Sequence, residues 1–236
     1  MFEVRNIAFS YGSHTVLRDV SFVVSPGETV SIVGDNGAGK TTLLRVLATL
    51  MTPERGTVRV NGQDAFSRPL AYRSQLGYMQ ENPALYEDMT VKSFLRYRAQ
   101  LKGEPAKRIR RRVSEAVDIC RLGECIDSRI RALSLGLKKR VALADAMLLR
   151  PRVMLLDDLL AGLDFRMREA AERIVSTVAA FSSVIVTGHE IPDLAKWSTR
   201  ILILRDGVIA DSISSAGLDG SEFAARVDRA LRGGAK

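Results

Sequence analysis

The chain has 236 residues, of which 46% are hydrophobic and 26% charged, with a formal net charge of +8 at pH 7. This composition is ordinary for a globular protein and excludes a disordered chain. No run approaches the roughly 18 to 20 apolar residues of a membrane-spanning helix, and the N-terminus lacks a secretory signal pattern, so we expect a soluble cytoplasmic protein.

Much of the excess positive charge lies in one segment, KGEPAKRIRRR, residues 102–112. Without interleaved aromatic residues for base stacking, the segment does not indicate nucleic-acid binding, and no nucleic-acid partner is expected. Two interpretations remain, a solvated helix face or a surface near acidic lipid head groups or a charged partner. The two cysteines, Cys120 and Cys125, have no His or Cys cluster nearby and are expected to be free thiols.

Short β-branched runs alternate with longer segments of helical period along the chain. The expected strands are ETVSIVG (28–34), RVMLLD (152–157), SVIVTG (183–188) and RILIL (200–204). This alternation predicts an α/β protein with a substantially parallel sheet. The dipeptides Asn61-Gly62 and Asp206-Gly207 predict two hairpin turns.

The segment from Glu87 to Arg150 is almost entirely helix-forming, with breaks at Gly103, Pro105 and Gly123. It predicts a helical insertion in the sheet. We therefore expect one domain over 1–236, with a core of about 1–84 and 151–216, a helical subdomain of about 85–150 and a C-terminal helical tail, 217–236. Within the tail, only LRGGAK (231–236) is expected to be frayed.

A glycine-rich loop, GDNGAGKTT, lies between the first expected strand and a helical run. It matches GxxxxGK[ST] in the strand, loop and helix context that a phosphate loop requires. The glycines let successive backbone N–H groups point at phosphate oxygens, Lys40 would reach the β- and γ-phosphates, and Thr41 would offer its hydroxyl to Mg²⁺. The residues expected to bind the nucleotide here are Gly34, Asp35, Asn36, Gly37, Ala38, Gly39, Lys40, Thr41 and Thr42.

Asp157 ends the apolar run VMLLD. A carboxylate at the carboxyl end of a buried strand faces the crevice where open α/β sheets bind ligands, so Asp157 is the expected Mg²⁺ ligand. Together with the loop, it makes a nucleoside-triphosphate site the leading hypothesis.

These motifs, in this order and spacing, resemble those of the nucleotide-binding subunit of an ATP-binding cassette (ABC) transporter, over nearly the whole chain. The resemblance implies a P-loop NTPase fold, with a RecA-like mixed or parallel sheet core, an antiparallel β subdomain and a helical insertion subdomain. It implies ATP and Mg²⁺ as ligands.

The same resemblance assigns further residues. Tyr11 in FSYG would stack on adenine, Gln80 in LGYMQEN would sense Mg²⁺ and the attacking water, and His189 in VTGHE would be the switch histidine. The signature sequence matches RALSLGLKKR at Ser134 to Leu137, and the D-loop matches AGLD at Asp164. Each residue alone also has a structural interpretation, such as a helix N-cap for Ser134, and their joint order carries the assignment.

The family's signature sequence does not serve its own phosphate loop. The resemblance implies that two cassettes pair head to tail, so that Ser134 and the N–H of Gly136 close on the γ-phosphate held by the partner. It also implies an integral membrane permease subunit and a second ABC subunit, identical or related. The chain would then lie on the inner face of the cell membrane, held there by the permease.

The signature of this chain is LSLGL, in which Leu135 and Leu137 replace the glycine and glutamine of the common LSGGQ. It is similar to variants frequent among bacterial exporters of drugs, peptides or antibiotics. The chain also ends about where the core cassette ends, without the added domain of many sugar importers. Both features favour an exporter.

Other classes share these motifs. DNA-repair and chromosome-organising ATPases separate the phosphate loop from the metal strand by hundreds of residues, whereas Lys40 and Asp157 are close in this sequence. Translation-associated cassettes carry two copies in one chain. A regulatory ABC subunit that binds ATP but hydrolyses it slowly, or not at all, remains an open alternative.

The residues that follow the metal aspartate keep the regulatory alternative open. The family usually places a glutamate and a proline after the metal aspartate, and this chain has Asp158 and Leu159. A carboxylate retracted by roughly 1.5 Å can cost on the order of a hundredfold when it must orient a water. We expect Asp158 to occupy the catalytic position, with His189 and Gln80, and to support slow turnover.

Overall fold

A computed structural model describes residues 1–233, in which strands and helices alternate along most of the chain. The strands are β1 (Phe2–Tyr11), β2 (His14–Val24), β3 (Thr29–Val33), β4 (Arg55–Val60), β5 (Gln63–Asp64), β6 (Leu76–Met79), β7 (Val153–Leu156), β8 (Ser183–Thr187), β9 (Arg200–Arg205) and β10 (Val208–Ser214). The α-helices are α1 (Lys40–Leu47), α2 (Pro69–Arg73), α3 (Val91–Leu101), α4 (Ala106–Ile119), α5 (Leu135–Met147), α6 (Phe165–Ala179), α7 (Ile191–Trp197) and α8 (Gly220–Arg232), and the 3₁₀ turns are η1 (Gly123–Cys125) and η2 (Ile130–Ala132).

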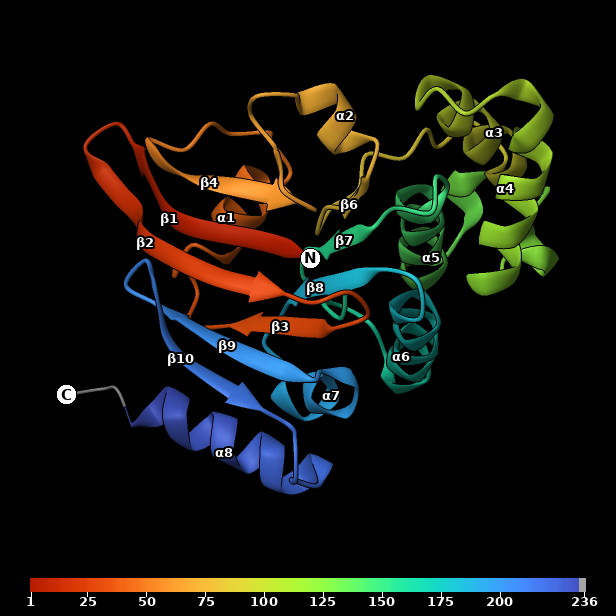
Figure 1. Ribbon diagram of the computed structural model, residues 1–236. Coiled ribbons are helices and arrows are strands. Elements are labelled where there is room, and N and C mark those ends of the chain that lie inside the picture. The colour runs from red at the N-terminus through yellow and green to blue at the C-terminus, as the bar shows by residue number, and fades with distance from the viewer. Residues whose placement is uncertain (234–236) are drawn as a thin grey trace.

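The strands form one 10-stranded sheet in the order β5-β4-β1-β2-β10-β9-β3-β8-β7-β6. Strands β9, β3, β8, β7 and β6 pair in parallel, whereas β1, β2, β4 and β5 pair antiparallel. Figure 1 shows the antiparallel strands at one end of the molecule and helices α3 and α4 at the other. The predicted fold class, an α/β P-loop fold with an antiparallel part and a helical insertion, is confirmed.

Strand β7 shows how the sheet separates two hydrophobic cores. All of its residues are buried, and because side chains alternate along a strand, they divide between the two faces. Val153 and Leu155 join the core around α1, β1 and β2, whereas Met154 and Leu156 join the core under α5 and α6. An apolar run without alternation therefore marks a strand that is covered on both faces.

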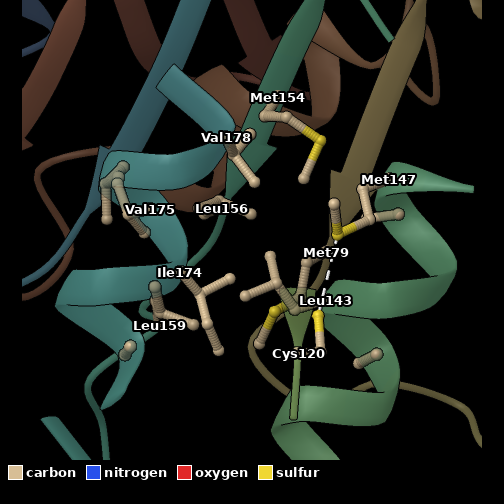
Figure 2. Close-up of a cluster of buried hydrophobic side chains, with 14 of the residues drawn as sticks. Met79, Cys120, Leu143, Met147, Met154, Leu156, Leu159, Ile174, Val175 and Val178 are labelled. Carbon is tan, nitrogen blue, oxygen red and sulfur yellow. Dashed lines mark hydrogen bonds between the residues drawn. The ribbon is translucent and has the colours of Figure 1, made fainter. Parts of the chain in front are cut away.

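The core under α5 and α6 is rich in sulfur at the contact between the helical insertion and the sheet. Figure 2 shows Met79 and Met154 from the sheet, Met147 from α5 and Cys120 at the end of α4 gathered between these elements. The thiol of Cys120 lies 3.6 Å from the sulfur of Met147. Both cysteines are free, as predicted, but only Cys120 is fully buried.

Burial raises the pKa of the Cys120 thiol to about 12. Since only the thiolate reacts and the buried thiol stays protonated at pH 8, Cys120 should be inert in the native protein. We expect Ellman's reagent to label Cys125, which is partly exposed, and both cysteines only in denaturant. Equal labelling rates in the native protein would contradict this placement.

Helices α3, α4 and α5 pack together in the segment expected to form the insertion. An ionic cluster joins α3 to α5: Nε and Nη2 of Arg98 donate to the two carboxylate oxygens of Asp145 at 3.0 and 2.9 Å. The Nζ of Lys102 lies 2.9 Å from Asp145 Oδ1. The side chain of Asp145 is 13% exposed, so the cluster is largely removed from water.

Much of the basic segment is paired with carboxylates. The pairs are Lys102 with Asp145, Arg108 and Arg112 with Glu104, and Arg111 and Arg112 with Glu115. This pairing offsets part of the positive charge of the segment and favours the interpretation of a solvated helix face.

Both hairpin turns predicted from dipeptides are present. The φ angles are 49° and 79° at Asn61 and Gly62, between β4 and β5, and 48° and 76° at Asp206 and Gly207, between β9 and β10. Positive φ at both central residues is what a type I′ turn requires, and Asn, Asp and Gly tolerate it best.

Two helix ends differ from the sequence-based expectation. The helix-forming segment expected to run to Arg150 ends earlier, because α5 stops at Met147 and Arg150, with a φ of 50°, cannot continue a helix. Helix α8 runs through Arg232, so the start of LRGGAK is helical rather than frayed. Its first turn is fixed by a capping box between Asp219 and Glu222. The rest of the frayed-tail prediction, at 234–236, lies outside the described residues.

Within residues 1–233, each helix is too short or too polar to cross a bilayer.

Candidate nucleotide-binding site

The glycine-rich loop lies between β3 and α1, as predicted, and its last three residues, Lys40, Thr41 and Thr42, form the start of α1. Gly37 and Gly39 have φ angles of 83° and 101°, which favour glycine. A Cβ at Gly34 would lie 2.2 Å from the carbonyl oxygen of Leu204, so the loop packs directly on the end of β9. These three glycines therefore permit a loop conformation that side chains would block.

A cleft of about 420 Å³ opens above this loop. It is lined by Tyr11, His14, Val16, Asn36, Gly37, Gly39, Lys40, Thr41, Thr42, Glu81, Asp157, Asp158, Thr187 and His189. The structure thus brings most of the residues singled out from the sequence to one cavity. Asp35 and Ala38 line an adjoining hollow that shares Asn36 and Gly37 with the cleft.

Lys40 folds back over the loop. Its Nζ donates to the carbonyl oxygens of Gly34 at 2.7 Å and Asp35 at 3.0 Å. Burial lowers the pKa of Lys40, and the nearby carboxylates of Asp158, Asp35 and Asp157 oppose this shift. The ammonium group is therefore held at the loop by neutral acceptors that a phosphate oxygen could replace.

Asp157 joins the loop to the sheet. Its side chain, 1% exposed, follows β7, and Oδ1 accepts hydrogen bonds from Thr41 Oγ1 at 3.1 Å and Thr187 Oγ1 at 2.8 Å. Burial raises the pKa of Asp157, whereas these two hydrogen bonds lower it.

This donor set fits Mg²⁺, which prefers hard oxygen ligands such as a carboxylate and a hydroxyl. Within residues 1–233, no group of three or more His, Cys, Asp or Glu side chains could hold a metal ion by itself. A magnesium ion held by Thr41 and Asp157 would thus need further oxygens, and nucleotide phosphates and waters supply them in such sites.

Asp158 lies beside Asp157 in the cleft, in a left-handed backbone conformation with φ of 45°. Its N–H donates to Thr187 Oγ1 at 3.0 Å, and its Oδ1 is buried without a hydrogen-bond partner among the described residues. Burial raises the pKa of Asp158; His189 and Lys139 lower it, and the carboxylates of Glu190 and Glu81 raise it further. Such a group suits the handling of a proton or a water.

Tyr11 stands at the mouth of the cleft with its side chain half exposed. Its ring meets that of Phe9 edge to face at 4.9 Å, and its hydroxyl lies 3.3 Å from the sulfur of Met51. These contacts hold the half-exposed ring at the mouth of the cleft, and its stacking on adenine stays a prediction.

Gln80 is not brought to this cleft. It follows β6, is exposed, and lines a separate groove with Tyr86, Phe94 and Arg98. The next residue, Glu81, lines the cleft instead. The role of Gln80 as a sensor of Mg²⁺ and water stays a prediction.

The cleft also contains residues that the sequence analysis missed, among them Glu81, His14 and Thr187. Thr187 could have been found, because it ends the strand SVIVT and the carboxyl ends of parallel strands meet at one edge of the sheet. His14 and Glu81 carry no comparable local signal.

The signature residues lie outside the cleft of their own chain. Ser134 caps α5, where its side chain accepts a hydrogen bond from the N–H of Leu137 at 3.4 Å, as predicted. A Cβ at Gly136 would lie 2.7 Å from the sulfur of Met167, so the first turn of α5 packs tightly on α6. Asp164 caps α6 through a hydrogen bond from the N–H of Met167 at 2.9 Å.

The sequence and the structure are similar to those of known proteins. A sequence profile of the family described as "ABC transporter" matches residues 17–161. A Halobacterium salinarum protein named as an ABC transporter ATP-binding protein is 36% identical over 212 residues, 89% of this chain and 91% of its own. The "Nod factor export ATP-binding protein I" of Paraburkholderia xenovorans is 33% identical and matches 91% of this chain and 71% of its own length.

A protein named for import is also similar to this chain. The "Spermidine/putrescine import ATP-binding protein PotA" of Haemophilus influenzae is 33% identical over 88% of this chain, which spans only 56% of that relative's length. A solved structure, "Structure of ATP binding subunit of ABC transporter", superimposes with a TM-score of 0.83 at 28% identity, over 97% of this chain and 99% of the other. With the phosphate loop, the buried aspartate and the signature helix in place, the chain belongs to the ATP-binding proteins of the ABC transporter family.

Proposed function

We propose that this chain binds ATP with Mg²⁺ in the cleft above the phosphate loop and hydrolyses it to drive a membrane transporter. One observation carries the proposal: Thr41, at the start of α1, and Asp157, at the end of β7, are joined by a 3.1 Å hydrogen bond at the rim of the glycine-rich loop. The Thr41 hydroxyl, the Asp157 carboxylate and the Lys40 ammonium thus line one cleft, beside loop N–H groups that can bind phosphate oxygens.

Each residue then has a separate task. Lys40 would exchange its carbonyl acceptors for β- and γ-phosphate oxygens, and Tyr11 would stack on the adenine. Thr41 and Asp157 would hold the Mg²⁺, which supplies neutralisation of phosphate charge when bound. Asp158 would orient the attacking water, with His189 lining the same cleft close by.

Head-to-tail dimerisation accounts for the residues outside the cleft. Ser134, Gly136 and Asp164 do not line the cleft of their own chain, so they would act on the nucleotide or the surface of a second cassette. The same surface exposes Leu135 and Phe165, at 55% and 68%. Since such apolar side chains gain from burial, a partner that covers them supports the arrangement.

We further propose export as the direction of transport, with a permease subunit that holds the chain at the inner face of the membrane. The support is the signature, with Leu135 and Leu137, and the similarity to a Nod factor export protein; the similarity to an import protein argues the other way. The second candidate, a regulatory subunit with little hydrolysis, is favoured by the short carboxylate of Asp158.

The test is ATP binding by Lys40→Ala. Loss of the ammonium should weaken the binding of a fluorescent ATP analogue in Mg²⁺ buffer by about 10- to 100-fold, because charge-assisted hydrogen bonds are lost. Lys138→Ala is the control, since Lys138 pairs with Glu87 and does not line the cleft. Equal affinities of wild type and Lys40→Ala would contradict the proposed site.

A further inference from the structure

Lys139 is a buried lysine in the second turn of α5, 4% exposed. Its Nζ donates to three backbone carbonyl oxygens, those of Asp158 at 3.0 Å, Leu159 at 3.2 Å and Ala161 at 2.7 Å. Among residues 1–233, no carboxylate forms an ion pair with it within 4.0 Å. All three N–H donors of the ammonium are therefore used to hold one segment of backbone.

A buried ammonium without an ion pair is costly unless its hydrogen bonds are complete. Burial lowers the pKa of Lys139, and the carboxylates of Asp158, Glu81 and Glu190 oppose the shift. The buried ammonium group of Lys139 therefore needs complete hydrogen bonding, and the three carbonyl oxygens provide it.

The segment held in this way connects the end of β7 to α6. Inside it, the N–H of Ala161 donates to the carbonyl of Asp158 at 3.2 Å, and that of Leu163 donates to the carbonyl of Leu160 at 3.1 Å. At the far end, Arg168 Nε donates to the carbonyl of Leu163 at 3.0 Å. Two cations, on α5 and α6, thus fix the carbonyls of this segment.

The start of α5 makes a second contact with the same segment. Leu135 packs so closely on Gly162 that a Cβ there would lie 3.0 Å from Leu135 Cδ2. Leu135 belongs to the signature, and Lys139 follows it by about one turn. A movement of the signature end of α5 would therefore be passed to the segment that begins with Asp158.

We propose that Lys139 is a positioning residue that fixes the backbone of 158–161 and so couples the signature helix to the carboxylate of Asp158. The left-handed conformation of Asp158 is one that surrounding contacts must enforce, and the Lys139 bond to its carbonyl is such a contact. The role of Lys139 in hydrolysis rests on the function proposed above. Its hydrogen bonds to the 158–161 backbone do not depend on that function.

The experiment compares Lys139→Met, Lys139→Arg and the control Lys138→Met in two measurements. In steady-state ATP hydrolysis, Lys139→Met should lower kcat at least about tenfold with KM changed less than about twofold, because orientation is lost and nucleotide contacts are not. Lys139→Arg should recover most of kcat, since a guanidinium also donates several hydrogen bonds. Lys138→Met should match wild type.

The second measurement is hydrogen–deuterium exchange without nucleotide. Lys139→Met should raise the exchange rate of amides in 158–164 at least about tenfold over Lys138→Met, because the turn loses its anchor. Should the methionine variant not fold, Lys139→Gln takes its place in both measurements.

The outcomes separate the two proposals. If wild type hydrolyses ATP and Lys139→Met retains both kcat and slow exchange, the positioning role is wrong and the function stands. If wild type shows no hydrolysis, the proposed ATPase function fails, and the exchange rates still decide whether Lys139 holds the segment. A kcat loss that Lys139→Arg does not reverse, with unchanged exchange, also overturns the role.

Discussion

Asp158→Asn is expected to lower kcat for ATP hydrolysis by about 100- to 1,000-fold while changing ATP affinity less than about threefold. Asparagine keeps the size of aspartate but cannot accept a proton, and a positioned general base contributes on this scale. Asp158 lines the cleft, and its Oδ1 has no protein partner that would occupy it. Asp118→Asn, on the exposed surface of α4, is the control.

Asp158→Glu should act in the opposite direction. An added methylene extends the carboxylate toward the position that the family's glutamate occupies, and kcat should rise by up to about 100-fold. If Asp158→Glu gains nothing and wild type already turns over at rates of about 1 s⁻¹ or more, the proposal of slow turnover is wrong.

The same asparagine variant offers a readout of assembly. If ATP joins two cassettes and hydrolysis releases them, Asp158→Asn with ATP and Mg²⁺ should accumulate as a dimer. Light scattering should then give twice the mass of the 25.9 kDa chain. A monomer at saturating ATP would contradict this cycle for the isolated chain.

Asp145→Ala is expected to lower the free energy of unfolding by about 3 kcal/mol. The change leaves Arg98 and Lys102, both largely buried, without their shared carboxylate, and removing one partner of a buried pair is strongly destabilising. For a domain of this size the melting temperature should fall by about 6 to 12 °C.

The matched control for this experiment is Asp228→Ala. It breaks the pair of Asp228 with Arg232, whose side chains are 46% and 80% exposed, and pairs so exposed contribute little. Its melting temperature should stay within about 2 °C of wild type. Equal shifts in the two variants would show that the cluster between α3 and α5 contributes no more than a surface pair.

The phosphate loop, the strand that ends at Asp157 and both hairpin turns could be predicted because each is encoded by neighbouring residues. A glycine, a β-branched run or an Asn-Gly pair restricts the backbone wherever it occurs. The capping of α5 by Ser134 is equally local. Features of this kind carry their physical cause within a few residues of sequence.

The missed features depend on chain segments that meet only in the folded state. Lys139 lies in the charged run Lys138 to Arg140 and would be expected in solvent, yet the 158–161 segment crosses over it and buries it. Glu81 reaches the cleft because β6 pairs with β7 at the edge of the sheet. Strand order and long-range packing decide both placements, and local periodicity does not report them.

The sulfur-rich core between the helical insertion and the sheet bears on how these two parts can move. Met79, Met147 and Met154 meet at this joint, as Figure 2 shows. Unbranched thioether chains have more torsions to adjust than Val or Ile and refill gaps of changing shape at low cost. This joint is therefore suited to absorb a small rotation of α5 against β7 by rotamer changes rather than by opening cavities.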